Sequence, residues 1–284
     1  MPQAVIVHDV LGTLFSLDEP ISALRQAFSD QLSSQPDIVP ELIIMDWYHA
    51  AQRDFLNLSI NNAYMPFSEV FKSTLPRILL QAGLKPTDAS VPKAAATSDV
   101  ANALRRGGAL QGPGPNGDVK GFDDEVSQIM SSLRRLTPRP GMLEAWKRYE
   151  AAHAEVWGAT NGGLALASKL FEGALGQGCI QKQQQDRGTA LFSCDEIEVA
   201  KPDARVYEAV RQRATQGRQP QTIDLWFVAT HTWDLFAAKK AGFKTAWVWN
   251  EEFHASSAIY GEPDIIASNL DDAAKQILER ALRT

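Results

Sequence analysis

Hydrophobic and polar residues follow two different periodicities along this chain. Residues 4–7 form an apolar run without a polar position, which is typical of a strand buried on both faces of a parallel sheet. Similar short apolar runs occupy residues 155–160, 190–193, 225–229 and 245–249. Apolar residues at helical spacing separate them, at residues 142–149, 163–175, 203–213 and 233–241. Strands that alternate with helices predict an α/β fold with a doubly wound parallel sheet.

A long helical stretch interrupts this α/β pattern after the first strand. Apolar residues three or four apart fill most of residues 17–75, and the same spacing returns over residues 123–136. The segment between them, about residues 83–121, is rich in Gly, Pro, Ala, Ser and Thr, which predicts an insertion. We therefore predict two domains, a core of residues 1–15 and 138–284 and an inserted helical domain of residues 16–137.

Composition narrows the classes of function. A chain of 284 residues with 44% hydrophobic content can bury one substantial core and carry a smaller second domain. The net charge of -6 is spread along the chain without a basic cluster, so we expect small-molecule partners and no nucleic acid. No apolar stretch has the length of a membrane span, and the N-terminus lacks a basic leader with an apolar segment. We therefore expect no membrane contact and a cytoplasmic location.

Asp9 stands where the first predicted strand ends, and Gly12 and Thr13 follow in a turn. In an open α/β sheet, ligands bind at the carboxyl ends of the strands. A carboxylate in that position can attack a carbon or phosphorus centre and form a covalent ester, which water then cleaves. The alternative is that Asp9 caps the next element, because Asp is common at turns and helix starts.

Polar residues also follow three later strands. Thr160, Asn161 and Gly162 follow the second strand, Lys201-Pro202 follows the third, and residues 230–234 follow the fourth with His231, Trp233 and Asp234. The carboxyl ends of parallel strands meet at one edge of a sheet. We therefore predict that these residues share a cleft with Asp9.

The order of these four motifs resembles the haloacid dehalogenase superfamily, and the resemblance covers nearly the whole chain outside the insertion. Within the superfamily, the chain is most similar to the 2-haloacid dehalogenase branch. The similarity there lies in Tyr207 six residues after Lys201, in Phe227-Val228 ahead of Trp233-Asp234, and in Ala238-Lys239 before Ala241-Gly242-Phe243. It implies a Rossmann-like core, a helical cap that closes over the substrate, and a possible homodimer.

The resemblance also implies a role for each motif. Asp9 attacks the substrate, Lys201 keeps Asp9 ionised, and Asp234 activates the water that hydrolyses the ester. Hydrogen-bond donors at this edge bind a substrate carboxylate or a developing anion. We assign this binding to Thr13, Thr160, Asn161 and Gly162, and we expect Leu11, Tyr207 and Trp233 to line the same pocket.

Leu11 bears on the reaction type. Phosphatases of the superfamily usually place a second Asp two residues after the nucleophile, where it protonates the leaving oxygen. Leu11 occupies that position here and cannot donate a proton. We therefore expect no metal and no cofactor, while Asp9 and Asp234 leave a Mg²⁺-dependent phosphatase as the alternative.

Two positions depart from the dehalogenase pattern. The family has an Arg after a Trp in the cap, and alignment on Trp47 puts Tyr48 there. Arg53, one helical turn further, either replaces that Arg or forms an ion pair on a helix face. In the fourth motif the family's Ser and Asn correspond to Ala229 and His231. A His there could act as base, proton shuttle, substrate-binding group or structural residue.

These inferences predict a hydrolase that removes halide from a small 2-haloacid through an aspartyl ester on Asp9. We name Asp9, Lys201, Asp234, Thr13 and His231 as the catalytic group. The alternatives are the phosphatase, a lyase or other tailoring enzyme of small-molecule metabolism, and a non-catalytic binding protein.

Overall fold

The chain forms two compact units. The computed structural model describes residues 3–86, 122–181, 188–215, 218–219 and 222–281. The core unit consists of Met1–Ser16, Ser59–Pro66 and Leu136–Thr284, and the helical unit of Leu17–Leu58 and Phe67–Arg135. Most of the predicted insertion, residues 87–121, lies outside the described residues.

The core unit is built on a six-stranded sheet in which every strand runs parallel to its neighbours. The spatial order is β3-β2-β1-β4-β5-β6. The strands are β1 (Gln3–Asp9), β2 (Glu155–Thr160), β3 (Ala190–Ser193), β4 (Ile223–Ala229), β5 (Lys244–Val248) and β6 (Ile265–Ala267). The doubly wound parallel sheet predicted from the sequence is confirmed.

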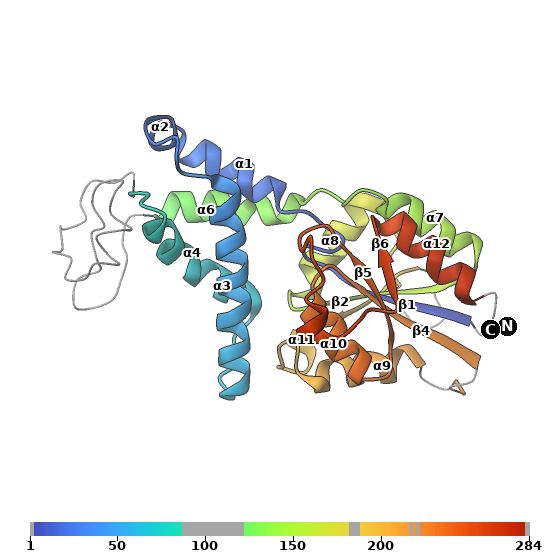
Figure 1. The fold of residues 1–284 in the computed structure, drawn as a ribbon. Helices are drawn as coiled ribbons and strands as arrows, with labels where there is room; N and C mark the ends of the chain where they lie inside the picture. The colour runs from blue at the N-terminus through green and yellow to red at the C-terminus, as the bar shows by residue number, and fades with distance from the viewer. Residues whose placement is uncertain (1–2, 87–121, 182–187, 216–217, 220–221, 282–284) are drawn as a thin grey trace. The chain divides into compact units, whose positions relative to one another are not determined.

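Helices cover both faces of this sheet. Figure 1 shows α7 and α12 on one face and α9 and α10 on the other. The helices of the core unit are α7 (Met142–Ala151), α8 (Leu164–Leu175), α9 (Ala204–Thr215), α10 (Thr232–Lys240), α11 (Ser257–Tyr260) and α12 (Leu270–Ala281), with a 3-10 turn η2 (Cys194–Glu196). Because helices lie on both faces, the apolar run of β1 is buried from Ala4 to Val7.

Asp9 lies at the end of β1, at the point where the order of the strands in the sheet reverses. β1 pairs with β2 on one side, where Asp9 lies opposite Ala159, and with β4 on the other. The chain continues outward from β2 to β3 on one side and from β4 to β5 on the other. Ligands of open α/β folds bind at the carboxyl ends of the strands at such a switch point.

The helical unit contains the elements between β1 and α7, apart from the end of α3. They are α1 (Asp18–Ala27), α2 (Ser29–Ser34), α3 (Pro40–Ile60), α4 (Phe67–Gln81), α6 (Asp123–Ser132) and the 3-10 turn η1 (Leu133–Arg135). Trp47 of α3 packs against Phe71 of α4 and donates its indole N–H to the Phe71 carbonyl at 2.9 Å. Aromatic packing therefore joins α3 to α4.

The short segment Ser59–Pro66 belongs to the core unit although helices of the other unit flank it. The Ser59 hydroxyl accepts a hydrogen bond from the backbone N–H of Ala200 at 2.9 Å. The Tyr64 hydroxyl donates to Asp195 at 2.6 Å. These bonds anchor the segment beside the loop that precedes Lys201.

The sequence pattern missed the last strand and helix. β6 has three residues, which is too short to show a periodicity. α12 does show one, because its buried residues Leu270, Ala273, Ala274 and Ile277 recur at helical spacing. Within the described part of the chain, no helix has the length and hydrophobicity needed to cross a membrane.

Candidate active site

A tight turn after β1 presents Asp9 at the edge of the sheet. Gly12 has a φ of 87°, a conformation that side chains with a Cβ rarely adopt. Its N–H donates to the Phe15 carbonyl at 2.9 Å, and its carbonyl accepts from Arg139 Nε at 3.0 Å. The glycine lets the chain reverse directly behind the carboxylate.

Lys201 joins two carboxylates that are far apart in sequence. Its Nζ lies 2.8 Å from Asp9 Oδ1 and 3.0 Å from Asp234 Oδ2, and only 1% of the side chain is exposed. Burial alone would lower the pKa of Lys201, but Asp234 and Asp9 outweigh burial and raise it. Lys201 is therefore a fixed positive charge between the two acids.

Further hydrogen bonds orient both carboxylates. The Thr13 hydroxyl donates to Asp9 Oδ2 at 2.8 Å and accepts from the Thr230 N–H at 3.0 Å. The Tyr207 hydroxyl donates to Asp234 Oδ1. Burial and the Asp234 charge raise the pKa of Tyr207 well above its ordinary value, so the phenol stays protonated. Burial also raises the pKa of Asp234, although Lys201 opposes this.

The residues after β2 support the site through their own hydrogen bonds. Asn161 Oδ1 accepts from the Lys201 backbone N–H at 3.0 Å and from the Cys194 thiol at 3.2 Å. The Gly162 N–H donates to the Thr160 hydroxyl at 2.9 Å. The Asn161 side chain therefore positions the backbone of Lys201, and the Gly162 N–H is already bonded to Thr160 in the same turn.

His231 lies at the same edge and is paired with a residue that the sequence reasoning missed. Its Nε2 is 3.3 Å from Glu251 Oε2, and its ring stacks on Trp233 at 5.5 Å between ring centroids. Arg139 forms an ion pair with the other Glu251 oxygen. Glu251 lies shortly after the end of β5 at Val248, and this position after a strand is the signal in the sequence that points to it. Arg139, in the loop before α7, is not among the site residues predicted from the sequence.

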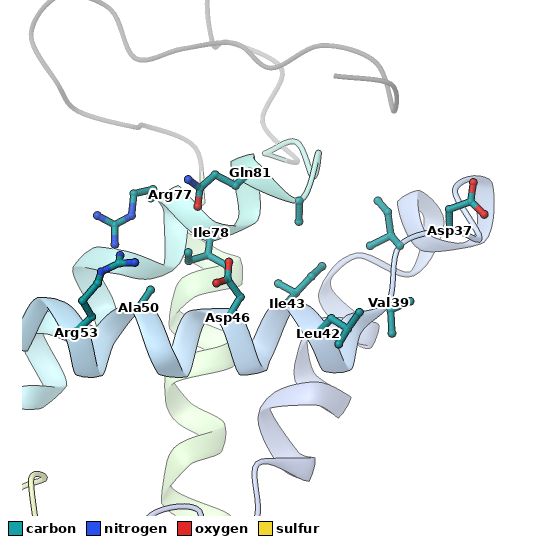
Figure 2. Close-up of a pocket in the computed structure, with 12 residues that line it drawn as sticks. Asp37, Val39, Leu42, Ile43, Asp46, Ala50, Arg53, Arg77, Ile78 and Gln81 are labelled. Atoms are coloured by element: carbon teal, nitrogen blue, oxygen red, sulfur yellow. The ribbon is translucent and has the colours of Figure 1, made fainter. Parts of the chain in front are cut away.

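Tyr48 and Arg53 belong to the helical unit. The buried Tyr48 ring stacks on Phe71, and Arg53 pairs with Asp54 at 3.2 Å, with 63% of its side chain exposed. Arg77 also pairs with Asp54, at 2.5 Å. The two arginines line a cavity of about 560 Å³ within this unit. Figure 2 shows them side by side at one end of it.

The core unit thus brings together most of the residues predicted from the sequence. Asp9, Thr13, Lys201, Tyr207 and Asp234 form one hydrogen-bonded network. Leu11 is half-buried in the turn that follows Asp9. A buried, oriented carboxylate beside a second carboxylate and a fixed ammonium can perform nucleophilic attack followed by hydrolysis. Among the described residues, no group of three or more His, Cys, Asp or Glu side chains could hold a metal ion.

Comparison with known proteins gave curated relatives but no matching family model. An (S)-2-haloacid dehalogenase from Pseudomonas fluorescens is 26% identical over 158 residues, which cover 55% of this chain and 64% of the relative. One from Pseudomonas putida is 25% identical over the same share of each chain. The match therefore spans less than two thirds of these relatives.

Solved structures show a shared fold over almost the full length. An L-2-haloacid dehalogenase from Xanthobacter autotrophicus, solved with chloropropionic acid covalently bound, has a TM-score of 0.67 at 19% identity and covers 98% of both chains. A putative HAD-hydrolase from Bacillus subtilis bound to magnesium has a TM-score of 0.55 at 11% identity. Both structures share the α/β fold that the sequence pattern predicts for this chain.

Proposed function

We propose that this protein hydrolyses the carbon–halogen bond of a small 2-haloacid through a covalent ester on Asp9. The observation that carries the proposal is the buried Lys201 ammonium, which lies within 3.0 Å of both Asp9 and Asp234. The ammonium favours the ionised form of the nucleophile and fixes a second carboxylate beside it. The names of the curated relatives support the same substrate class.

The reaction needs only these side chains and one water. An Asp9 oxygen attacks the carbon that bears the halogen, the carbon–halogen bond breaks, and the halide leaves with its electron pair. Water then attacks the carbonyl carbon of the ester while Asp234 accepts its proton. The ester bond breaks, Asp9 returns to a carboxylate, and a 2-hydroxyacid and a proton are released.

The remaining predicted residues have supporting roles in this proposal. Thr13 orients Asp9, and Tyr207 holds Asp234 for proton transfer. Asn161 fixes the backbone of Lys201. We propose that the substrate contacts Thr160, Gly162, Leu11 and Trp233.

A metal-independent reaction fits the arrangement of charges better than a magnesium-dependent one. A magnesium ion would need Asp9 and Asp234 as ligands. The Lys201 ammonium bridges these two carboxylates and supplies the positive charge that a metal would otherwise provide. We therefore propose that the enzyme works without a cofactor.

Halide release from (S)-2-chloropropionate, measured with and without a metal chelator, tests the proposal. We expect turnover that the chelator does not change. Asp9→Asn should lower turnover by about 10³-fold or more, because the amide is a poor nucleophile. Asp203→Asn is the matched control, since Asp203 pairs with the surface residue Arg205.

A single turnover in ¹⁸O-labelled water tests the ester itself. In the proposed route the oxygen of the first product comes from Asp9, and the water oxygen enters the Asp9 carboxylate. Mass spectrometry should find the label in the peptide that contains Asp9 and not in the first product. Label in the first product would contradict the ester. Hydrolysis of p-nitrophenyl phosphate that a chelator abolishes, without halide release, would favour the phosphatase.

A further inference from the structure

A second charged cluster lies beside the proposed nucleophile and has no role in the mechanism above. It consists of His231, Glu251 and Arg139. His231 Nε2 lies 3.3 Å from Glu251 Oε2, and Arg139 pairs with the other oxygen of Glu251. The Glu251 side chain is only 6% exposed. Arg139 also donates to the Gly12 carbonyl behind Asp9, so the cluster is tied to the turn that carries the nucleophile.

Backbone contacts hold His231 close to both reacting carboxylates. Its neighbour Thr230 donates an N–H to the Thr13 hydroxyl, which in turn donates to Asp9. The His231 carbonyl accepts the N–H of Asp234 at 3.1 Å. His231 therefore occupies the same edge as Asp9 and Asp234.

The balance of charge at this edge favours a protonated His231. Four carboxylates act there, Asp9, Asp234, Glu251 and Glu252, and the permanent cations among the described residues that pair with them are Lys201 and Arg139. Burial alone would lower the pKa of His231, but Glu251, together with smaller contributions from Asp9 and Glu252, outweighs burial and raises it.

We propose that His231, held by Glu251, is a cationic subsite that binds the anion of a small ligand next to Asp9. The anion is the carboxylate of a small acid or a released halide. In this assignment, Glu251 is a positioning residue and Arg139 fixes Glu251. The identity of the ligand rests on the proposed function, whereas the charge of His231 does not.

A positive charge on His231 also decides between the roles of base and substrate-binding group, which the sequence left open. A protonated imidazole cannot accept a proton from water. In this assignment, Asp234 removes the proton in the hydrolytic step, and His231 contributes charge to binding. The rate constant kcat/KM for an anionic substrate should fall as the pH rises through the pKa of His231, because the neutral form no longer attracts the anion.

NMR titration of the histidine side chains in the intact protein tests this without any turnover. His231→Asn identifies the resonance of His231. In the wild type we expect the His231 pKa above 6.5, and Glu251→Gln should lower it by about one unit or more. Glu252→Gln is the matched control. Its carboxylate accepts hydrogen bonds from Thr232 and not from His231, so most of the elevation should persist.

Ligand arms of the same titration identify the anion. Propionate should raise the His231 pKa further, and neutral propionamide should not. A rise with bromide but not with propionate would assign the subsite to the halide. His231→Asn should weaken propionate binding about tenfold or more and leave propionamide unaffected.

Two results would overturn the inference. One is a His231 pKa at or below 6.5 in the wild type. The other is equal propionate affinity in wild type and His231→Asn. If Glu251→Gln does not fold, the wild-type and His231→Asn titrations still decide the outcome. Loss of haloacid turnover with an intact His231 titration would refute the proposed function alone.

Discussion

Two buried histidines, His8 and His231, lie close to Asp9, and they differ in their surroundings and in the direction of their pKa shifts. His8 precedes Asp9 on β1 and packs against the rings of Trp146 and Tyr149, at centroid distances of 5.1 and 5.6 Å. His231 follows β4 and faces Glu251. They are 0% and 2% exposed, respectively. Burial therefore cannot explain why their pKa values shift in opposite directions.

The difference lies in the partner that each ring meets. Among the residues that the structure describes, neither ring nitrogen of His8 has a hydrogen-bond partner. The contact between His231 Nε2 and Glu251 Oε2 also does not meet hydrogen-bond geometry, but at 3.3 Å it lies within ion-pair distance. Burial lowers the pKa of His8 to about 3, and the nearby Asp9 charge only partly opposes this. Glu251 reverses the outcome for His231, whose pKa is raised. A counter-charge within contact distance decides whether a buried histidine is part of the core or part of a charged site.

Removal of Lys201 should cause the largest change, because the buried carboxylates of Asp9 and Asp234 share this cation. Lys201→Met leaves Asp9 and Asp234 buried without their cation. We expect a loss of about 3–5 kcal/mol in the free energy of unfolding and a loss of turnover of about 10³-fold or more. Urea unfolding and initial rates measure the two effects.

Lys239→Met is the control for this substitution. Lys239 pairs with Asp264 at 3.0 Å, but its side chain is 47% exposed. We expect the control to cost no more than about 1 kcal/mol. Equal costs for the two variants would show that the Lys201 bridge is no stronger than a surface ion pair.

The second largest effect is expected for His8→Phe, on the loss of folding stability in acid. The folded state binds a proton at His8 only near pH 3, whereas the unfolded chain binds one near pH 6.5. His8 therefore costs stability as the pH falls below 6.5, by about 2 kcal/mol at pH 5. His8→Phe should remove this part of the acid sensitivity in urea titrations at pH 7, 6 and 5.

The opposite sign is expected for His231. A raised pKa stabilises the fold fully below pH 6.5, and the contribution is lost as the pH rises through the folded-state value. His254→Phe is the control for both, because that side chain is exposed. An unchanged acid sensitivity in His8→Phe would mean that His8 protonates readily in the folded protein.

The sequence predicted the charged edge of the sheet better than it predicted the partners of either histidine. The residues of this edge stand at or after the ends of apolar strands, and parallel strands bring such positions together. They are Asp9, Thr160, Lys201 and Asp234. His8 follows the apolar run of the first strand, which predicts a buried core residue with its hydrogen bonds satisfied; the ring is buried, but the second part of that prediction is wrong. Its lack of a hydrogen-bond partner could not be predicted, because Trp146 and Tyr149 lie about 140 residues further along the chain.

Other features depend on tertiary contacts that a single sequence does not show. Glu251 belongs to a pair of acids in a loop, a pattern that usually indicates a solvated turn. Only the structure shows that Glu251 turns toward His231 while Glu252 bonds to Thr232. Helical spacing likewise assigned Tyr48 to a helix without showing that its ring stacks on Phe71.

The smallest effect is expected for Arg53, the other cation considered as an anchor for the substrate anion. Arg53 and Arg77 both pair with Asp54. Burial alone would raise the pKa of the Asp54 carboxyl group, but the two arginines outweigh burial and lower it. Because Arg53 is largely exposed, Arg53→Gln should change the free energy of unfolding by about 0.5 kcal/mol or less. Its charge is already paired, so KM for (S)-2-chloropropionate should change by less than about twofold, against about tenfold for His231→Asn.

Arg77→Gln is the matched control, since it removes the other guanidinium from the same carboxylate. Similar, small effects of both arginine variants on KM would leave His231 as the anion-binding charge. A tenfold rise in KM for Arg53→Gln alone would instead assign the anchor to the helical unit. The contrast between His8 and His231 would then concern the stability of the fold and not the recognition of substrate.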